Sequence, residues 1–208
     1  MDSPMELRVV PLLCPECGRT LPAGEDDALF YCADCAVAWE LEGTSLARRE
    51  VYHLAGEGTL FLPFWILPFQ VTTREGTVGT VEDYRGLSGA VGNGNGPARS
   101  GLPLLYVPAY PYQSPLHLIR AGRLLTLRQP VMTLSRTRPS RIHPVVFREE
   151  DARKTGATIL LATVTEDRKR ALRFLESFSC TFGKGRLCTI PFAGNGSKFY
   201  HAALNLEL

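Results

Sequence analysis

Short apolar segments, rich in β-branched and aromatic residues and bounded by glycine, proline or polar residues, recur along the chain. Segments of this kind are typical of β-strands. The sequence predicts strands over residues 28–31, 37–41, 49–54, 59–73, 102–110, 157–164, 186–192 and 199–206. Glycines between the third and fourth segments favour a hairpin there, and Gly194 and Gly196 favour another before the last segment.

The segment over 59–73 contains two prolines, Pro63 and Pro68. Because proline has no N–H to donate to a strand ladder, the two are not expected together in a central strand. The sequence therefore predicts an edge strand, a bulge or a bend. The dense aromatic residues of this segment favour a place in the core, with an exposed patch for a partner as the alternative.

Three other segments have helical patterns. Ser114 followed by Pro115 is a favourable start for a helix that runs to about residue 128. Residues 149–156 are acidic first, basic last and end in glycine, which predicts a second, short helix. A third helix is expected over 165–178. The predicted buried stripe of the first helix is Leu116, Ile119, Leu124 and Leu125.

Residues 76–101 include a Gly-Asn-Gly-Asn-Gly-Pro run and few large apolar side chains, which is typical of a flexible Gly-rich loop or linker. A phosphate-binding loop would need a preceding strand, a following helix and a final lysine before serine or threonine, and the sequence lacks this pattern. The mixture of many strands and few helices predicts a β-rich mixed α+β body over residues 46–208.

The sharpest motif is a set of four cysteines in the pattern Cys-x2-Cys-x14-Cys-x2-Cys. Two cysteines separated by two residues share one turn, and a second such turn placed opposite completes a tetrahedron of sulfurs. This spacing is close to that of zinc sites, and soft thiolates prefer zinc or iron to hard cations. Zinc is favoured, with iron, disulfides or redox chemistry as the alternatives. The candidate ligands are Cys14, Cys17, Cys32 and Cys35.

The first of these turns reads Cys-Pro-Glu-Cys-Gly and resembles the first knuckle of the zinc-ribbon family. The second turn has Ala33 and Ala36 where that family commonly has proline and glycine. The resemblance covers residues 7–41 and implies a small zinc ribbon over 1–45 that holds one structural Zn²⁺. Since the chain supplies all four ligands, no position is left for water or substrate, so the ion is expected to be structural and not catalytic. Trp39 is expected to pack beside it.

The formal net charge of +2 hides an uneven distribution. Residues 1–50 hold ten acidic and four basic side chains, a net −6, whereas residues 51–208 hold eleven acidic and nineteen basic side chains, a net +8. A negative field repels phosphates, so the ribbon is not expected to hold nucleic acid. It is instead expected to dock on the basic body or on a basic partner.

Seven arginines and no acidic residue occur between residues 117 and 148. A solvated face, or the complement of the acidic ribbon, is the favoured interpretation. An acidic protein partner is the next, and nucleic acid is less favoured because aromatic residues do not alternate with the arginines. Besides Arg148, the candidate anion or partner contacts are Arg120, Arg123, Arg128, Arg136, Arg138 and Arg141.

No apolar run is long enough for a membrane-spanning helix, and no secretory leader precedes the cysteines, so a reducing cytoplasm is the expected setting. The remaining cysteines, Cys180 and Cys188, are expected to be buried small side chains, with a thiol pair as the alternative. The four histidines are scattered and no catalytic motif is recognisable, so no catalytic residue is predicted.

The sequence thus favours a non-catalytic, structural-zinc protein that acts as an adaptor or accessory subunit through protein–protein contacts. One alternative is a nucleic-acid-binding protein that uses the arginine-rich stretch 120–148. The other is an enzyme with an unrecognised site, which would require a pocket that gathers His53, His143 or His201 with acidic residues.

Overall fold

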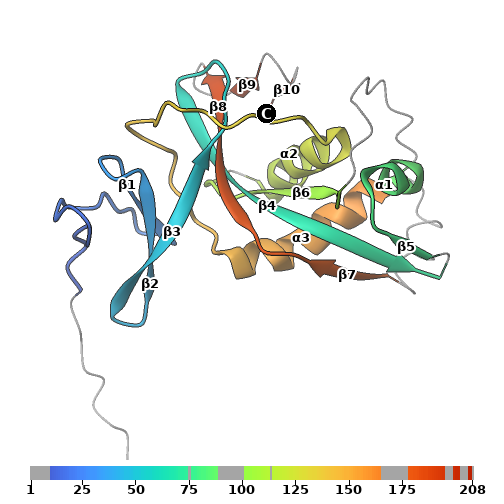
Figure 1. Cartoon of the computed structure of the whole chain (residues 1–208), viewed down its shortest axis with the longest axis horizontal. Coiled ribbons are helices and arrows are strands. Elements are labelled where there is room, and N and C mark those ends of the chain that lie inside the picture. Colours follow the sequence, from blue (N-terminus) through green and yellow to red (C-terminus); the bar gives the residue numbers. More distant parts are fainter. Residues whose placement is uncertain are drawn as a thin grey trace, which may run out of the picture.

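A computed structural model describes residues 10–74, 76–88, 101–112, 114–164, 178–194, 199–201 and 206–207. Within these ranges the strands form a mixed sheet and three helices pack beside it, so the class is α+β, as predicted (Figure 1). Among the same residues, no helix is both long and apolar enough to cross a membrane. The helices are α1 (Val81–Ser88), α2 (Pro115–Arg128) and α3 (Glu149–Val164).

The sheet runs in the order β1-β2-β3-β8-β4-β5, while β6 and β7 also pair with β4, and β9 pairs with β8 and β10. The continuous sheet joins the cysteine-bearing strands to the rest of the chain, because β3 pairs with β2 through its first residues and with β8 through its last. The strands are β1 (Leu29–Cys32), β2 (Val37–Glu42), β3 (Ser45–His53), β4 (Leu60–Thr73), β5 (Gly76–Val78), β6 (Leu104–Pro108), β7 (Ser179–Phe182), β8 (Arg186–Gly194), β9 (Phe199–His201) and β10 (Leu206–Glu207).

The hairpin predicted between β3 and β4 is wrong, because β8 lies between them, parallel to β3 and antiparallel to β4. The connection from β3 to β4 crosses over the end of β8. A Cβ atom at Gly58 would lie 2.6 Å from the carbonyl oxygen of Phe192, so the glycine allows this close crossing and does not make a tight turn. The hairpin predicted at the other end of β8 is present as its antiparallel pairing with β9, although residues 195–198 lie outside the described ranges.

β4 is a central strand: β8 and β7 pair with one of its sides, and β6 and β5 with the other. The prediction that its prolines place it at an edge is therefore wrong. Each proline lies where a neighbouring ladder stops. Past the last β6 pair, the N–H of Ala109 donates to the Pro63 carbonyl at 2.9 Å, and the Ala109 carbonyl accepts from Val146 at 2.7 Å. Pro68 faces the break between β7 and β8, where Gly183 donates to its carbonyl at 2.8 Å. The missing N–H groups therefore interrupt no ladder.

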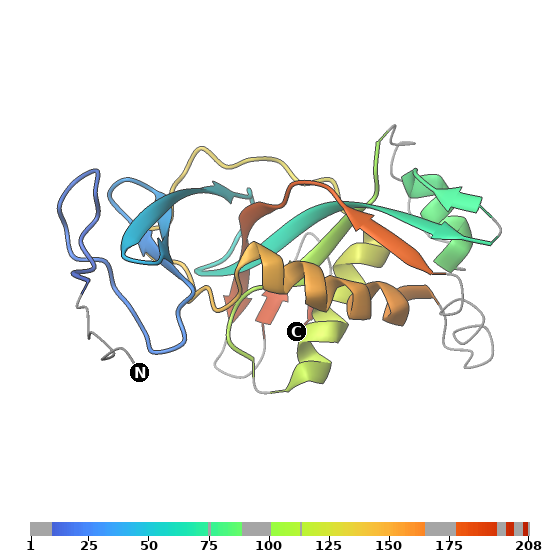
Figure 2. The same cartoon turned by 90° about the horizontal axis from the view of Figure 1, so that it is seen from below.

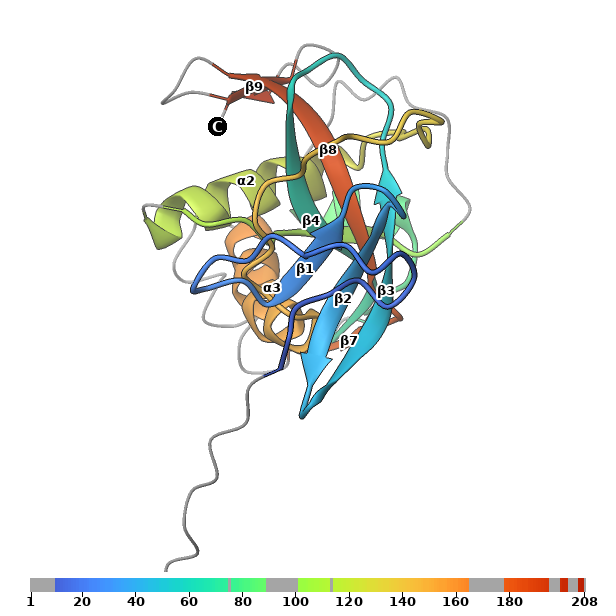
Figure 3. The same cartoon turned by 90° about the vertical axis from the view of Figure 1, so that its left-hand side faces the viewer.

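Both faces of β4 are buried, which confirms that its aromatic segment belongs to the core. Alternate residues enter two clusters of buried side chains, as expected for a strand covered on both sides. Figures 2 and 3 show α2 and α3 on the same side of the layer that β4 and β8 form. The residues facing one cluster are Leu62, Phe64 and Ile66, and those facing the other are Trp65, Leu67 and Phe69.

α2 begins and ends as predicted, and the Ser114 hydroxyl accepts a hydrogen bond from the N–H of Leu116 at 3.3 Å. In the predicted stripe, Leu125 is buried and Ile119 and Leu124 pack partly buried against the core. Leu116 is wrong, because it is 73% exposed, and the buried face includes small and polar residues as well. Thr126 accepts from the N–H of Tyr106, and the Gln129 side chain bonds to both backbone groups of Leu104. These side chains cover the open edge of β6, which fixes the helix against the sheet.

α3 is one continuous helix, so both the predicted stop at Gly156 and the strand predicted over 157–164 are wrong. A Cβ atom at Gly156 would lie 2.6 Å from Cδ2 of Leu105 on β6. The glycine therefore lets the helix approach the sheet closely. The next predicted helix, over 165–178, falls almost entirely outside the described residues.

The loop predicted over 76–101 is wrong in its first half, which forms β5 and α1. Thr80 and Asp83 exchange hydrogen bonds between side chain and backbone, both at 3.1 Å, and so cap the start of α1. Tyr84 is 1% exposed and packs its ring edge-on against Phe69. The glycine-rich residues 89–100 lie outside the described ranges.

Candidate metal centre

Two tight turns carry the four cysteines. In the first, the N–H of Gly18 donates to the Cys14 carbonyl at 2.7 Å, and Gly18 has φ of 73°. In the second, the pairing of Cys32 with Val37 closes the β1–β2 hairpin, and Ala36 has φ of 53°. Both residues that follow the second cysteine of a turn are thus left-handed, a conformation that glycine adopts more readily than alanine.

The four sulfur atoms all lie within 4.8 Å of one another. The Sγ–Sγ distance is 3.9 Å between Cys14 and Cys35 and 3.6 Å between Cys17 and Cys32. A tetrahedral ion with metal–sulfur bonds of about 2.3 Å holds its sulfurs about 3.8 Å apart. The distances are too long for disulfides, and all four cysteines are free thiols. Number, type and spacing of the donors therefore fit one tetrahedral ion that prefers thiolates, such as zinc or iron.

The thiols differ in how readily they ionise. Burial opposes ionisation of Cys14, but hydrogen bonds from the backbone of Cys17 and Glu16 outweigh it and lower the pKa of Cys14 to about 7. Burial raises the pKa of Cys32, and burial together with the neighbouring sulfurs raises that of Cys35. Four thiolates this close repel one another, so a cation would be needed to hold them all deprotonated.

A small apolar cluster supports the cysteines from inside. Cys14 and Cys32 are 1% and 3% exposed, and Trp39 packs in the same cluster at 5% exposure. This confirms that Trp39 lies beside the cysteine set. The other buried members are Leu21, Phe30 and Val37.

A buried polar chain joins the cysteine-bearing hairpin to the body. The hydroxyl of Tyr31, next to Cys32, donates to the Pro139 carbonyl at 3.2 Å and lies 3.3 Å from Nε2 of His53. Nδ1 of His53 lies 2.8 Å from the hydroxyl of Thr189 on β8. With its hydrogen given to Pro139, Tyr31 accepts from Nε2, and Nδ1 of the neutral ring then accepts from Thr189. Burial lowers the pKa of His53 and raises that of Tyr31 to about 12.

An ion-pair cluster makes a second junction. Glu40 on β2 is 8% exposed and lies between Arg49, at 2.8 Å, and Arg148, at 3.3 Å. Arg148 also donates to the carbonyl of Leu41 at 3.2 Å. One arginine of the basic stretch therefore does pair with the acidic N-terminal segment.

The other arginines of that stretch do not form one site. Three of them, at 120, 123 and 128, lie on α2, and the remaining three lie on the connection over 129–148, which runs from α2 to the cysteine-bearing hairpin (Figure 1). On this connection, Arg136, Arg138 and Arg141 are exposed and have no ion pair or hydrogen bond to another described residue.

The histidines are not brought together. His53 belongs to the polar chain, the ring of His143 lies edge-on to Tyr110 at 6.2 Å, and His201 lies edge-on to Phe192 at 5.4 Å. Burial lowers the pKa of all three. Within the described ranges, the four cysteines are the one cluster of three or more metal-ligating side chains.

The two remaining cysteines lie far apart. Cys180 pairs opposite Val71 and Cys188 opposite Phe64, seven positions away on the same strand, which corresponds to about 23 Å. Burial raises the pKa of Cys180 to about 11 and that of Cys188 to about 12. Cys188 is buried, as predicted, whereas Cys180 is only partly buried, and the alternative of a thiol pair is wrong.

Sequence reasoning located the four cysteines but missed Tyr31, His53 and Glu40. A tyrosine next to a cysteine and a buried acid on an alternating strand are weak signals, because their partners are distant in sequence. Comparisons of the chain with protein-family models, with curated proteins and with solved structures found no match, so the resemblance to zinc ribbons rests on the cysteine pattern and its geometry.

Proposed function

We propose that this chain is a non-catalytic zinc protein, in which one structural Zn²⁺ bound by Cys14, Cys17, Cys32 and Cys35 holds a ribbon over residues 1–45, and that it acts as an adaptor or accessory subunit. The observation that carries the proposal is the set of four sulfurs within 4.8 Å of one another, supplied by two opposed turns. Four protein ligands complete a tetrahedral shell, which is the arrangement of structural zinc and not of catalytic zinc.

The ion would contribute most of the stability of this region. Zinc binding to small finger-like modules provides about 10–16 kcal/mol, whereas a segment of this length buries too little apolar surface to fold by itself. The apolar cluster around Trp39 is small, in keeping with that role. Free thiols at these positions suit a reducing compartment, and the cytoplasm is the compartment we propose.

The ribbon would in turn order a basic surface. β1 and the residue before it contact the connection over 129–148 at two points: Tyr31 donates to the Pro139 carbonyl, and the N–H of Ala28 donates to the Val145 carbonyl at 2.8 Å. Between these points lies Arg141, whose charge is unmatched by a described residue. An exposed arginine that has no partner among the described residues and lies beside a structural metal centre suits recognition of an acidic protein partner.

Nucleic acid is the weaker alternative. The arginines that would form its contact surface divide between α2 and the 129–148 connection. The three on the connection approach the acidic ribbon, whose field would repel a row of phosphates.

The test is native mass spectrometry of the tagged chain, isolated under reducing conditions from the cells that make it. The account expects one zinc ion per chain and a stoichiometric protein partner, with both lost in Cys14→Ser. The matched control is Cys180→Ser, which changes a thiol outside the cluster and should keep both. A strictly monomeric chain without a partner would contradict the adaptor role, even if zinc were bound.

A further inference from the structure

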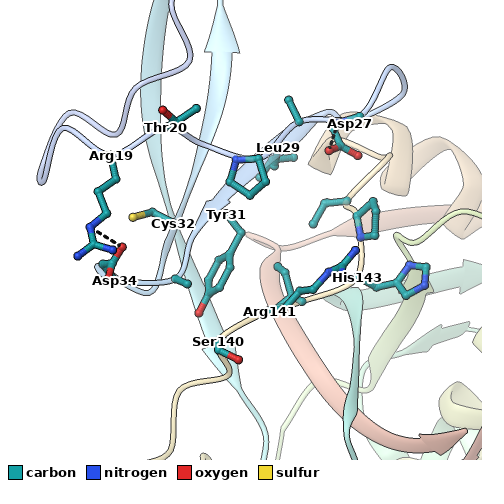
Figure 4. A pocket seen from close by; sticks show the side chains of 17 residues that line it. Arg19, Thr20, Asp27, Leu29, Tyr31, Cys32, Asp34, Ser140, Arg141 and His143 are labelled. Carbon is teal, nitrogen blue, oxygen red and sulfur yellow. Dashed lines mark hydrogen bonds and ion pairs between the residues drawn. The ribbon is translucent and has the colours of Figure 1, made fainter.

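A cleft of about 520 Å³ lies between the cysteine-bearing hairpin and residues 140–145 of the connection (Figure 4). One wall is formed by the loop over 19–27, β1 and the start of the second turn, and the opposite wall by the connection. Leu29, Ile142 and Val145, which are 2%, 7% and 1% exposed, give it an apolar lining. A cleft of this size accommodates a few residues of an extended chain or a small molecule.

Two arginines and two aspartates line the cleft. Arg19 forms an ion pair with Asp34 at 3.2 Å, and the Asp27 carboxylate accepts from the N–H of Gly24 at 2.7 Å. Arg141 has no ion pair or hydrogen bond to a described residue, and Figure 4 shows its side chain lying along the cleft wall. The ring of His143 points away from the cleft in the same view, in keeping with its packing against Tyr110. Arg141 is therefore the one arginine of the cleft without a direct partner among the described residues, while Asp27 keeps its own charge.

The edge of β1 also faces the cleft. The N–H of Leu29 bonds across to Val145, not to β2. Because backbone groups alternate sides along an antiparallel strand, the N–H and C=O of Tyr31 point the same way as those of Leu29. Past Leu29, no described residue of the connection pairs with this edge. Such an edge can accept one more extended segment by backbone hydrogen bonding.

We propose that this cleft binds an extended segment of a partner protein, with its backbone alongside Tyr31 and one of its carboxylates on Arg141. The proposal rests on the proposed adaptor function and names the contact that serves it. A single unmatched arginine suits one carboxylate. A polyphosphate is disfavoured because Asp27 and Asp34 line the same cleft.

The cysteine cluster determines the width of the cleft. Cys32 directly follows Tyr31, and β1 holds the connection on both sides of Arg141, at Pro139 and at Val145. Loss of the hairpin geometry would therefore release one wall from the other. Binding of the segment is therefore expected to need intact cysteines.

The test is fluorescence anisotropy of the full-length, zinc-loaded chain with a labelled, N-acetylated octapeptide of alternating valine and glutamate. The reference probe is the same peptide with glutamine in place of glutamate. The glutamate peptide should bind about tenfold more tightly, the change expected for one charge-assisted pair, or about 1.4 kcal/mol. Arg141→Gln should abolish this preference. The matched control is Arg120→Gln, an exposed arginine on α2 outside the cleft, which should keep it.

The proposal is overturned if neither peptide binds or if both bind equally. It is also overturned if Arg141→Gln keeps the preference for glutamate. The same holds if inorganic phosphate competes with the peptide no less effectively than acetate. Arg141 is exposed, so its variant should fold, and one bound zinc ion verifies that it does. This test and the adaptor test can fail independently. If Arg141→Gln retains the protein partner, the cleft is not part of the interface, but the adaptor role stands. If the wild-type chain is monomeric and has no partner, the adaptor role itself is contradicted.

Discussion

The Tyr31 hydroxyl lies 3.3 Å from Nε2 of His53, and this contact joins the hairpin that holds the cysteines to the strand that enters the body. His53 continues the chain to Thr189 on β8, at 2.8 Å. The position of the cysteine cluster is thus linked to the core by hydrogen bonds that are shielded from solvent. Buried polar chains of this kind favour one arrangement of two packed parts, because each member depends on the others.

Replacing Tyr31 with phenylalanine should lower the free energy of unfolding by about 1–3 kcal/mol, since it leaves the Nε2–H of His53 and the Pro139 carbonyl without their partner. Urea denaturation of the zinc-loaded protein measures the change. Tyr112→Phe is the matched control: Tyr112 contacts Phe147 through its ring and makes no hydrogen bond with a described residue, so the effect should stay within about 0.5 kcal/mol. Equal effects of the two changes would contradict a structural role for the Tyr31 hydroxyl.

Stability should fall as the pH is lowered from about 6.5, partly because of His53. Burial, and secondarily the charge of Arg138, holds the pKa of His53 below its ordinary 6.5 in the folded chain. The unfolded chain therefore binds the proton first, so the stability is present above pH 6.5 and is lost as the pH falls through the lower, folded pKa. Denaturation midpoints between pH 7.5 and 5.5 should show a shallower decline in His53→Gln. The midpoint of His117→Gln, a change on the exposed side of α2, should fall with pH as steeply as that of the wild type. An equally steep fall in His53→Gln would refute the contribution of His53.

Ala36→Gly should stabilise the zinc-loaded protein by about 1 kcal/mol, because φ of 53° strains alanine and not glycine. The converse change in the first turn, Gly18→Ala, should destabilise the protein by a similar amount, because Gly18 has φ of 73°. No atom lies within 4 Å of a Cβ atom placed at Gly18, so the effect should come from the backbone conformation alone. Denaturation of both variants, with zinc content measured in parallel, tests the pair. Changes of the same sign would show that the two turns are not equivalent.

Glu40 and Arg148 should show a clear coupling energy in a double-mutant cycle with glutamine at both positions. Glu40 is 8% exposed, and removal of its charge leaves Arg148 without its ion pair, although Arg49 keeps its pair with Glu42, so Glu40→Gln should cost about 1–3 kcal/mol. The exposed pair of Glu150 and Lys154, with atoms 2.8 Å apart, is the control and should couple by less than about 0.5 kcal/mol. A coupling no larger than in the control would mean that this contact does not hold the cysteine-bearing hairpin against the connection over 129–148.

The features that the sequence predicted well are local. The cysteine spacing places four donors on two turns, and Ser114 with Pro115 marks the start of α2 through groups a few residues apart. Ala36 is instructive: its departure from the common glycine marks the one strained residue of the second turn.

The features that failed depend on distant neighbours. Gly156 lies inside α3 and does not end it. The glycine is there because the side chain of Leu105 on β6 leaves no room for a Cβ atom. Pro63 and Pro68 are tolerated in a central strand because the ladders on either side stop at those points. The pairing of Glu40 with Arg148 spans more than a hundred residues, and nothing in either local sequence predicts it.

The most direct test of the central claim is the metal content of the full-length chain purified under reducing conditions, measured by elemental mass spectrometry. The account predicts one equivalent of zinc per chain, a loss of that zinc in Cys14→Ser or Cys35→Ser, and its retention in Cys188→Ser. Less than one equivalent in the wild type, or full retention after loss of one of the four clustered cysteines, would contradict a structural zinc centre.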